Sequence, residues 1–482
     1  MRFELAGQVG RSVFYAVGSF LLLSGLAGCS GGTVPPLSPP ATGMGLSASA
    51  NPVVVGVPLT LTATVTPSGA QGGFDFSDSS GKIGSVLLAT GSGSVTTTPT
   101  QVGTLPYSAT FDEVAGGPQL SASVNVAVGT APSASTCGLG TAGLTVLGAT
   151  ATQTGVNDSV SGDNQSGVCA QGAGSNVILN NETINKSGNA LSMFDPSGIN
   201  SAVLAYGVSD TATANALITV NGGTMATSGT GAYAAFATGA GSGVTLSGTT
   251  VNAGFNAVGA SMAGQVVLTH ATVNSSGYPL AAINGSGSVT ITDSTLTGPA
   301  GENGGVTGAL QLLSNLVPGA ATTAGKISIT GGNLIWTAGP LIAITGSESA
   351  VISLKNVAIT QGQDFLFSEG GTGAITVLAD GVNLSGTSQY QNAAVPVSLS
   401  LTNGSTFKGQ MSGAALTLDA TSSWTLTGSD SLGALSDAAG ISGTTLTNVV
   451  GNGNNATYDS AKSPLMGGKT YSLVGGGSLT PQ

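Results

Sequence analysis

Charged side chains are scarce in this sequence of 482 residues. Asp, Glu, Lys and Arg together make up 6% of the chain, whereas an ordinary soluble protein has about 25%. No arginine follows Arg11, and His270 is the only histidine. The formal net charge of −11 disfavours binding to nucleic acid, because phosphate backbones attract basic surfaces. The same scarcity removes the basic side chains on which many active sites depend.

Cysteine and aromatic residues are also few, whereas glycine and apolar residues are abundant. The chain has three cysteines and 78 glycines, and 40% of its residues are hydrophobic. A disordered chain would lack this much apolar material. Many β-branched residues and few helix formers indicate an all-β protein that works outside the cytoplasm.

Residues 1–28 have the pattern of an export signal. Two arginines accompany a mostly apolar run, Phe14 to Leu23, which is too short for a good transmembrane helix. The run leads into Leu-Ala-Gly-Cys at residues 26–29, which resembles the lipobox of bacterial lipoproteins. By that resemblance the chain is cleaved before Cys29, and Cys29 carries the lipid that anchors it in a membrane. An ordinary secretory peptide with a chance cysteine is the alternative.

Ser30, directly after that cysteine, resembles the outer-membrane sorting pattern of Gram-negative bacteria. We therefore expect a lipid-anchored protein of the outer membrane, displayed on the cell surface or facing the periplasm. Residues 29–43 are rich in Gly, Pro and Ser, which predicts an extended linker without a core.

Residues 44–130 contain several short segments in which apolar and polar residues alternate. Leu59, Leu61 and Ala63 occupy alternate positions in one of them, which is the period of a half-buried strand. Several such segments predict a β-sandwich. The opening, with Asn51-Pro52 and Gly-Val-Pro at 56–58, resembles bacterial Ig-like domains. The resemblance implies a spacer, with an adhesive module as the alternative, followed by a linker at 131–136.

Cys137 and Cys169 are the cysteines that remain once Cys29 is lipidated. An exported chain lives in an oxidising compartment, where a disulfide is the default for such a pair. The disulfide would close a loop of about 30 residues and stabilise the fold by about 3 kcal/mol. Metal binding is the alternative, but two thiols and one distant histidine are too few ligands.

Residues 244–298 contain three consecutive copies of one pattern. Leu246, Leu268 and Ile291 follow one another at a nearly constant interval, and each lies in a short alternating segment bounded by turn residues. A unit this small cannot bury its own apolar face, so copies must stack on one another. The sequence therefore predicts a solenoid with three short strands in each coil.

The pattern continues at intervals of about 22–25 residues through 137–482 and resembles the right-handed parallel β-helix of pectin-lyase-like proteins and autotransporter passengers. About fifteen coils fit into this region. We expect the disulfide to staple an N-terminal cap, and Tyr458 to Leu479 to form a C-terminal cap, because an open end would expose unpaired strand edges.

The resemblance raises the question of enzymatic activity, because many parallel β-helices are polysaccharide lyases, hydrolases or esterases. Those families use an Arg or Lys base, several close Asp residues, or two Asp with an Arg. The mature chain has no Arg, and its acidic residues are scattered singly, mostly at expected turns. We therefore predict no catalytic residue, no metal site and no cofactor. The densest acidic patch, residues 158–163, is expected to be a turn.

Three aromatic residues, Tyr233, Tyr278 and Trp336, are weak candidates for binding a ligand. They would form a sugar-stacking surface if they shared one face, and isolated aromatics on surfaces or turns are the alternative. His270 is expected on the solvent side of a strand.

Two classes of function remain. The first is a monomeric, non-catalytic surface lipoprotein, adhesin-like or structural, that presents its β-helix to extracellular glycans, surface polymers or other cells. The alternative is a carbohydrate-active enzyme, a polysaccharide lyase or hydrolase with an atypical site. The scarcity of charge and the missing basic residues favour the first class.

Overall fold

The computed structural model describes residues 39–482, except for segments at 50, 52, 55–58, 88–90, 114–118, 130–134, 194, 196, 208–214, 300–306, 314–323, 347–348, 363, 370–372 and 391–395. Cys29, the candidate lipidation site, lies outside the described residues. The chain divides into two compact units, with the boundary between residues 131 and 132.

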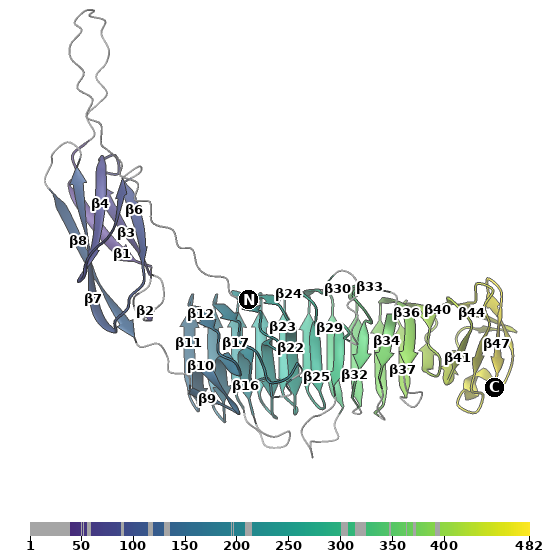
Figure 1. The fold of residues 1–482 in the computed structure, drawn as a ribbon. Coiled ribbons are helices and arrows are strands. Elements are labelled where there is room, and N and C mark those ends of the chain that lie inside the picture. Colours follow the sequence, from purple (N-terminus) through teal and green to yellow (C-terminus); the bar gives the residue numbers. More distant parts are fainter. Residues whose placement is uncertain are drawn as a thin grey trace, which may run out of the picture. The chain divides into compact units, whose positions relative to one another are not determined.

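The N-terminal unit is a sandwich of two β-sheets (Figure 1). One sheet has the strand order β1-β3-β6, and the other has the order β2-β8-β7-β4-β5. Leu59, Leu61 and Ala63 of β3 are buried against Phe74 and Phe111 of the other sheet, as their alternation predicted. The two packed sheets confirm the predicted β-sandwich, and its Ig-like character stays a prediction. The strands are β1 (Gly43–Ala48), β2 (Val53–Val54), β3 (Leu59–Thr66), β4 (Gly72–Asp78), β5 (Gly81–Leu87), β6 (Ser92–Thr97), β7 (Gly103–Glu113) and β8 (Leu120–Gly129).

The C-terminal unit is a right-handed parallel β-helix, as the repeat predicted (Figure 1). Three sheets run along it. The first sheet contains β10 (Gly140–Leu147), β13 (Gln165–Gln171), β16 (Ser201–Tyr206), β19 (Tyr233–Thr238), β22 (Asn256–Ser261), β25 (Ala281–Asn284), β28 (Leu310–Leu313), β31 (Ile342–Ile344), β34 (Asp364–Ser368), β36 (Asn383–Tyr390), β38 (Thr406–Gln410) and β40 (Ser423–Leu426).

The other two sheets repeat with the same coils. The second sheet contains β11 (Thr150–Thr154), β14 (Asn176–Asn180), β17 (Leu217–Asn221), β20 (Gly243–Ser247), β23 (Gln265–Thr269), β26 (Ser288–Thr292), β29 (Gly325–Thr330), β32 (Ala350–Lys355), β35 (Ile375–Asp380), β37 (Val397–Thr402), β39 (Ala415–Leu418) and β42 (Ala434–Ser436). The third sheet contains β12 (Asn157–Val160), β15 (Thr183–Lys186), β18 (Thr224–Thr227), β21 (Thr250–Ala253), β24 (Thr272–Ser275), β27 (Thr295–Thr297), β30 (Asn333–Trp336) and β33 (Ala358–Gln361).

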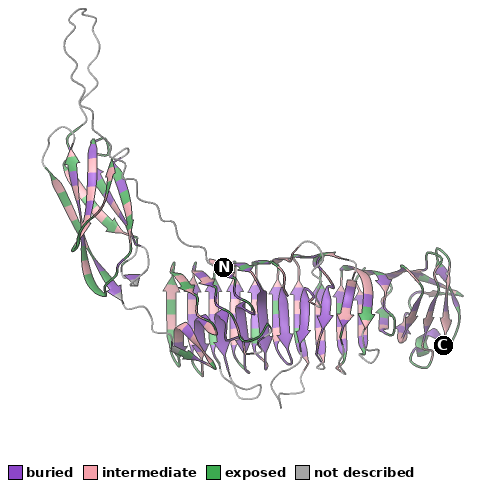
Figure 2. Ribbon diagram, viewed as in Figure 1, coloured by how far each residue is buried: buried purple, intermediate pink, exposed green. Residues whose placement is uncertain are grey.

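Apolar side chains at equivalent positions of successive coils stack inside the solenoid. Leu268 pairs in register with Leu246 on one side and Ile291 on the other, and all three are fully buried. Figure 2 shows the buried residues continuing from strand to strand along the unit. Each such side chain contributes about 1.5–3 kcal/mol when it leaves water, so the stack holds neighbouring coils together.

The expected number of about fifteen coils is wrong, because the second sheet has twelve strands. Most coils have the predicted length; for example, Gly243 pairs with Gln265 of the next coil. Two coils are far longer, since Asn176 pairs with Leu217 and Ser288 pairs with Lys326. The described residues of each long coil still form one strand in each of the three sheets, so the extra length adds no strand to the stack.

The expectation of three strands in every coil fails near the C-terminus. The third sheet ends at β33, and beyond it β36 pairs with β34 and then with β38 of the first sheet. Coils become shorter here, as the pairing of Ser398 with Ala415, and of Ala415 with Ala434, shows. The coil that starts at β35 still has the usual interval, since Ile375 pairs with Val397, but the one long strand β36 follows its turn. The coils after it are too short for a third strand and its turn.

The turn directly after the second-sheet strand has a left-handed residue in each of the first ten coils. Except at Asn403, the backbone N–H of this residue donates to a carbonyl oxygen of the second-sheet strand in the next coil; for example, His270 donates to Thr292 at 3.1 Å. Gly, Asn, Asp and His tolerate this conformation best. His270 is exposed as predicted, but it lies in this turn directly after β23, not within the strand. The column is Gly155, Asn181, Gly222, Gly248, His270, Asp293, Gly331, Asn356, Gly381 and Asn403.

Both ends of the solenoid are closed. At the N-terminal end, β9 (Ser135–Cys137) pairs antiparallel with β10, and a Cys137–Cys169 disulfide joins it to β13. The disulfide and its place in the N-terminal cap confirm the prediction from the sequence.

The C-terminal end finishes in short strands and one turn of 3-10 helix. The phenolic Oη of Tyr458 donates to the carbonyl oxygen of Lys469, and that of Tyr471 to Met466, both at 2.8 Å. β46 and β47 form an antiparallel hairpin, so the predicted cap is present. The elements are β41 (Asp430–Leu432), β43 (Ile441–Ser442), β44 (Thr445–Val450), β45 (Ala456–Tyr458), the 3-10 turn Pro464–Met466, β46 (Tyr471–Val474) and β47 (Ser478–Pro481).

Candidate functional site

The three candidate ligand-binding aromatics do not share a surface. Trp336 is fully buried in the solenoid core, where a side chain at Gly298 would overlap its ring. Tyr233 is also fully buried, and its ring packs edge-on to that of Phe236 with centroids 4.7 Å apart. Tyr278 is half-buried in a turn. The predicted sugar-stacking surface is therefore wrong, and so is the alternative of surface aromatics for Tyr233 and Trp336.

Tyr233 is buried because a long connection covers the outward face of the first sheet. Residues 187–200 link β15 to β16, and a side chain at Gly198 would overlap the ring of Phe236. The side-chain amide of Asn256, on β22, donates to the carbonyl oxygen of Met193 at 2.9 Å. Burial and the nearby Asp195 carboxylate raise the pKa of Tyr233, so its phenol stays neutral. This part of the first sheet is packed rather than open to a ligand.

Two ionisable side chains lie in the interior near the N-terminal end. Glu182 directly precedes β15, and Lys186 is its last residue. Each is 1% exposed. Burial raises the pKa of Glu182 to about 7, and the carboxylate of Asp158 adds to the shift. Burial lowers the pKa of Lys186 to about 8, and its Nζ donates to the carbonyl oxygen of Gly162 at 3.0 Å. These groups make the stability of the first coils sensitive to pH.

Two other carboxylates of the solenoid, Asp195 and Asp380, are engaged by neighbouring side chains and backbone. Asp195 Oδ1 accepts hydrogen bonds from the backbone N–H and the hydroxyl of Ser197 at 2.9 and 2.7 Å. Asp380 pairs with the Nζ of Lys355 at 2.9 Å and accepts from the side-chain amide of Asn403 at 2.6 Å. Acid–base catalysis of glycoside cleavage needs carboxyl groups that face one substrate, whereas these stabilise turns and neighbouring coils.

The acidic patch at 158–163 does not converge on one point. Asp158 occupies the inward position beneath Ile184, whereas Asp163 Oδ1 accepts the backbone N–H of Asn189 at 2.8 Å. Across the described residues, no three His, Cys, Asp or Glu side chains lie close enough to hold a metal ion. Within this same part of the chain, no helix is long and apolar enough to cross a bilayer.

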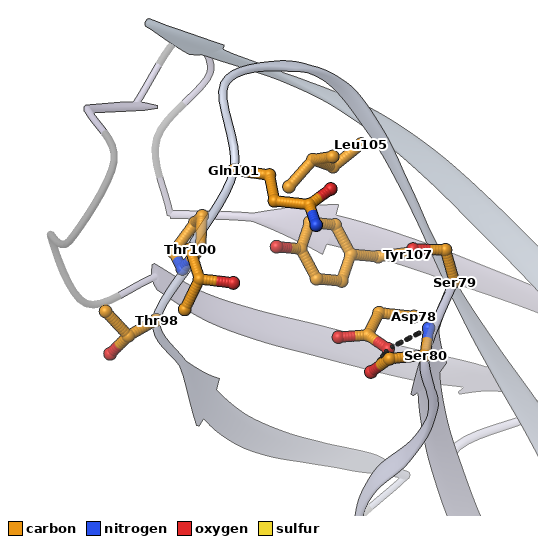
Figure 3. Close-up of a pocket in the computed structure, with 9 residues that line it drawn as sticks. Asp78, Ser79, Ser80, Thr98, Thr100, Gln101, Leu105 and Tyr107 are labelled. Atoms are coloured by element: carbon orange, nitrogen blue, oxygen red, sulfur yellow. Dashed lines mark hydrogen bonds between the residues drawn. The ribbon is translucent and has the colours of Figure 1, made fainter. Parts of the chain in front are cut away.

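The N-terminal unit has a small hollow beside Tyr107 (Figure 3). Asp78 Oδ1 accepts hydrogen bonds from the backbone N–H and the hydroxyl of Ser80 at 2.7 and 2.6 Å. The bond from the Ser80 side chain holds the pKa of Asp78 below its usual value, whereas burial raises the pKa of Tyr107. Asp78 therefore stabilises its own turn, and neither group is poised to transfer a proton near neutral pH.

The outward face of the third sheet carries two columns of uncharged residues, here called the third-sheet ladder. The inward residues of the same strands, such as Val251 and Val273, are fully buried, so the ladder is the opposite face. One column is Asn157, Thr183, Thr224, Thr250, Thr272, Thr295, Asn333 and Ala358; the other is Ser159, Asn185, Ala226, Asn252, Asn274, Thr297, Ile335 and Thr360.

The sequence analysis did not predict this surface, although the sequence contains part of the repeat that forms it. Thr-Val-Asn occurs at 250–252 and again one coil later, at 272–274. The alignment of Thr183 with Thr224 across the long insertion is apparent only from the strand register.

Comparison of the chain with protein-family models, curated proteins and solved structures finds no match. Functional inference therefore rests on the chain's own residues.

Proposed function

We propose that this protein is a non-catalytic lipoprotein of the outer membrane that displays its β-helix, as an adhesin-like or structural element, to glycans, surfaces or other cells. Cys29 carries the anchor in this proposal, and the Ig-like sandwich is a spacer. The supporting observation is that the outward face of the third sheet is uncharged and regular, while Asp195 and Asp380 are engaged with their neighbours.

A binding function is favoured over catalysis by the chemistry of the exposed faces. Thr272 and Asn274 are exposed, and the side-chain amide of Asn274 donates to Asn252 Oδ1 at 3.0 Å. A repeated array of this kind offers many weak, identical contacts, which add up when the partner is also repetitive. It provides no activated nucleophile or general base.

The alternative, a carbohydrate-active enzyme, has its best support in the parallel β-helix itself. Fold does not establish activity, because activity depends on the residues of a site.

Two assays on the purified chain separate these functions. We expect retention on a glycan array or on cell surfaces, and no release of reducing ends or unsaturated sugars from a panel of polysaccharides. Hydrolysis or β-elimination that is lost on substitution of one acidic residue would overturn the proposal.

A further inference from the structure

The third-sheet ladder forms a two-dimensional lattice of polar groups. Neighbouring strands of a sheet are about 4.8 Å apart, and alternate residues along a strand are about 6.7 Å apart. Five consecutive coils place threonine at the same position: Thr183, Thr224, Thr250, Thr272 and Thr295. The Asn252–Asn274 hydrogen bond links side chains of neighbouring coils within this lattice. The five strands that carry these residues follow one another in the third sheet, in the order β15-β18-β21-β24-β27.

The side chains of the ladder limit the classes of ligand that it could bind. None of its sixteen positions carries a charged or aromatic side chain. Charged polymers and ionic minerals would find no complementary charge, and a sugar polymer would have to bind through hydrogen bonds alone, without an aromatic face to stack on. What remains is a regular array of hydroxyl, methyl and amide groups, which matches a neutral and periodic hydrogen-bonding partner.

The edge of the ladder toward the second sheet has only short turns. Two residues separate the second-sheet strand from the third-sheet strand in each of the eight coils that contain both. On the other side of the ladder, a long connection, residues 187–200, leads from β15 to β16 of the first sheet. By contrast, the second sheet's outward face carries the exposed Leu217 and Leu378 and the Lys355–Asp380 ion pair.

We propose that the third-sheet ladder binds ice. Oxygen atoms on the prism faces of ice repeat at distances close to the two spacings of the ladder. Threonine hydroxyls and asparagine amides can hydrogen-bond to those oxygens, and the threonine methyl groups exclude disordered water between them. This partner rests on the proposed non-catalytic display of the β-helix, and it deepens that function by naming a crystalline surface as the ligand.

The test compares two matched double variants of the full chain. Thr250→Lys with Thr272→Lys places two charges in the ladder, at one half-buried and one exposed position. Thr245→Lys with Thr290→Lys does the same on the second sheet, again at one half-buried and one exposed position. The fraction of protein captured by a slowly growing ice surface is measured for both variants and the wild type, beside an unrelated protein that ice excludes.

We expect the ice to capture the same fraction of the wild type and of the second-sheet variant. The captured fraction of the ladder variant should be lower by a factor of at least about ten. Unfolding curves check that each variant is folded, and the single Thr272→Lys change at an exposed position replaces the double variant if that one is not. Exclusion of the wild type from ice, or equal loss in both variants, overturns the ladder proposal. Retained attachment to cells or glycans in that case leaves the proposed function standing, whereas polysaccharide cleavage overturns the proposed function itself.

Discussion

At the scale of single residues, Glu182 is the side chain whose burial has the largest consequence. It is 1% exposed, and burial raises its pKa from 4.5 to about 7. The folded state therefore prefers the protonated acid. The stability that this preference contributes is fully present below pH 4.5 and is lost as the pH rises through about 7. Since one pKa unit corresponds to about 1.4 kcal/mol, the loss is at most about 3 kcal/mol.

Replacing Glu182 by glutamine should remove this pH dependence, because the amide stays neutral. We expect Glu182→Gln to unfold at a higher denaturant concentration than the wild type at about pH 8, and at nearly the same concentration at about pH 5. Asp293→Asn is the control, because that carboxylate is exposed and asparagine tolerates its left-handed turn position. Parallel pH profiles for the wild type and Glu182→Gln would contradict the assignment.

At the scale of the element, the coil is the unit of stability. Each coil contacts mainly the coils before and after it, so damage to one should stay local. Leu268 and Val267 are adjacent on β23 but face opposite ways: Leu268 is fully buried in the stack, and Val267 is half-buried on the outward face.

Leu268→Asp should destabilise the surrounding coils by several kcal/mol, because it buries a carboxylate without a partner. Hydrogen exchange should then accelerate in β20, β23 and β26 and remain unchanged in the N-terminal sandwich. Val267→Asp is the matched control and should have little effect, since its side chain reaches solvent. Loss of protection in both units would show that the coils are not independent.

The N-terminal cap gives a second prediction at this scale. Replacing Cys137 and Cys169 by serine should lower the stability of the solenoid by about 3 kcal/mol, because the link closes a loop of 32 residues. A reductant should lower the unfolding temperature of the wild type and leave that of the double variant unchanged. Mass spectrometry of non-reduced peptides should show the two cysteines linked; two free thiols in the exported protein would refute the assignment.

At the scale of the whole molecule, the proposed anchor determines where the β-helix is presented. Cys29→Ser should move the protein from the membrane fraction to the soluble fraction, because the proposed lipid is then missing. Immunoblots of the two fractions measure the change, with the Cys137→Ser, Cys169→Ser variant as a control that keeps Cys29. Unchanged partition into the membrane would exclude lipidation as the means of anchoring.

The sequence by itself determined the repeating parts of the fold. Short alternating segments recur at an interval of about 22 residues. Leu246, Leu268 and Ile291 can be buried together only if these segments form stacked strands. The cysteine pair and the sandwich also followed from local pattern and compartment. These features depend on neighbouring residues or on one repeated interval.

Only the tertiary structure decided which surfaces are open. Tyr233 is enclosed because a connection distant in sequence folds across the first sheet. Trp336 is enclosed because its position points into the core beside Gly298. The third-sheet ladder depends on register across insertions, as in the pairing of Thr183 with Thr224. Burial and register are set by chain segments far apart in sequence, and no local pattern encodes which of them will meet.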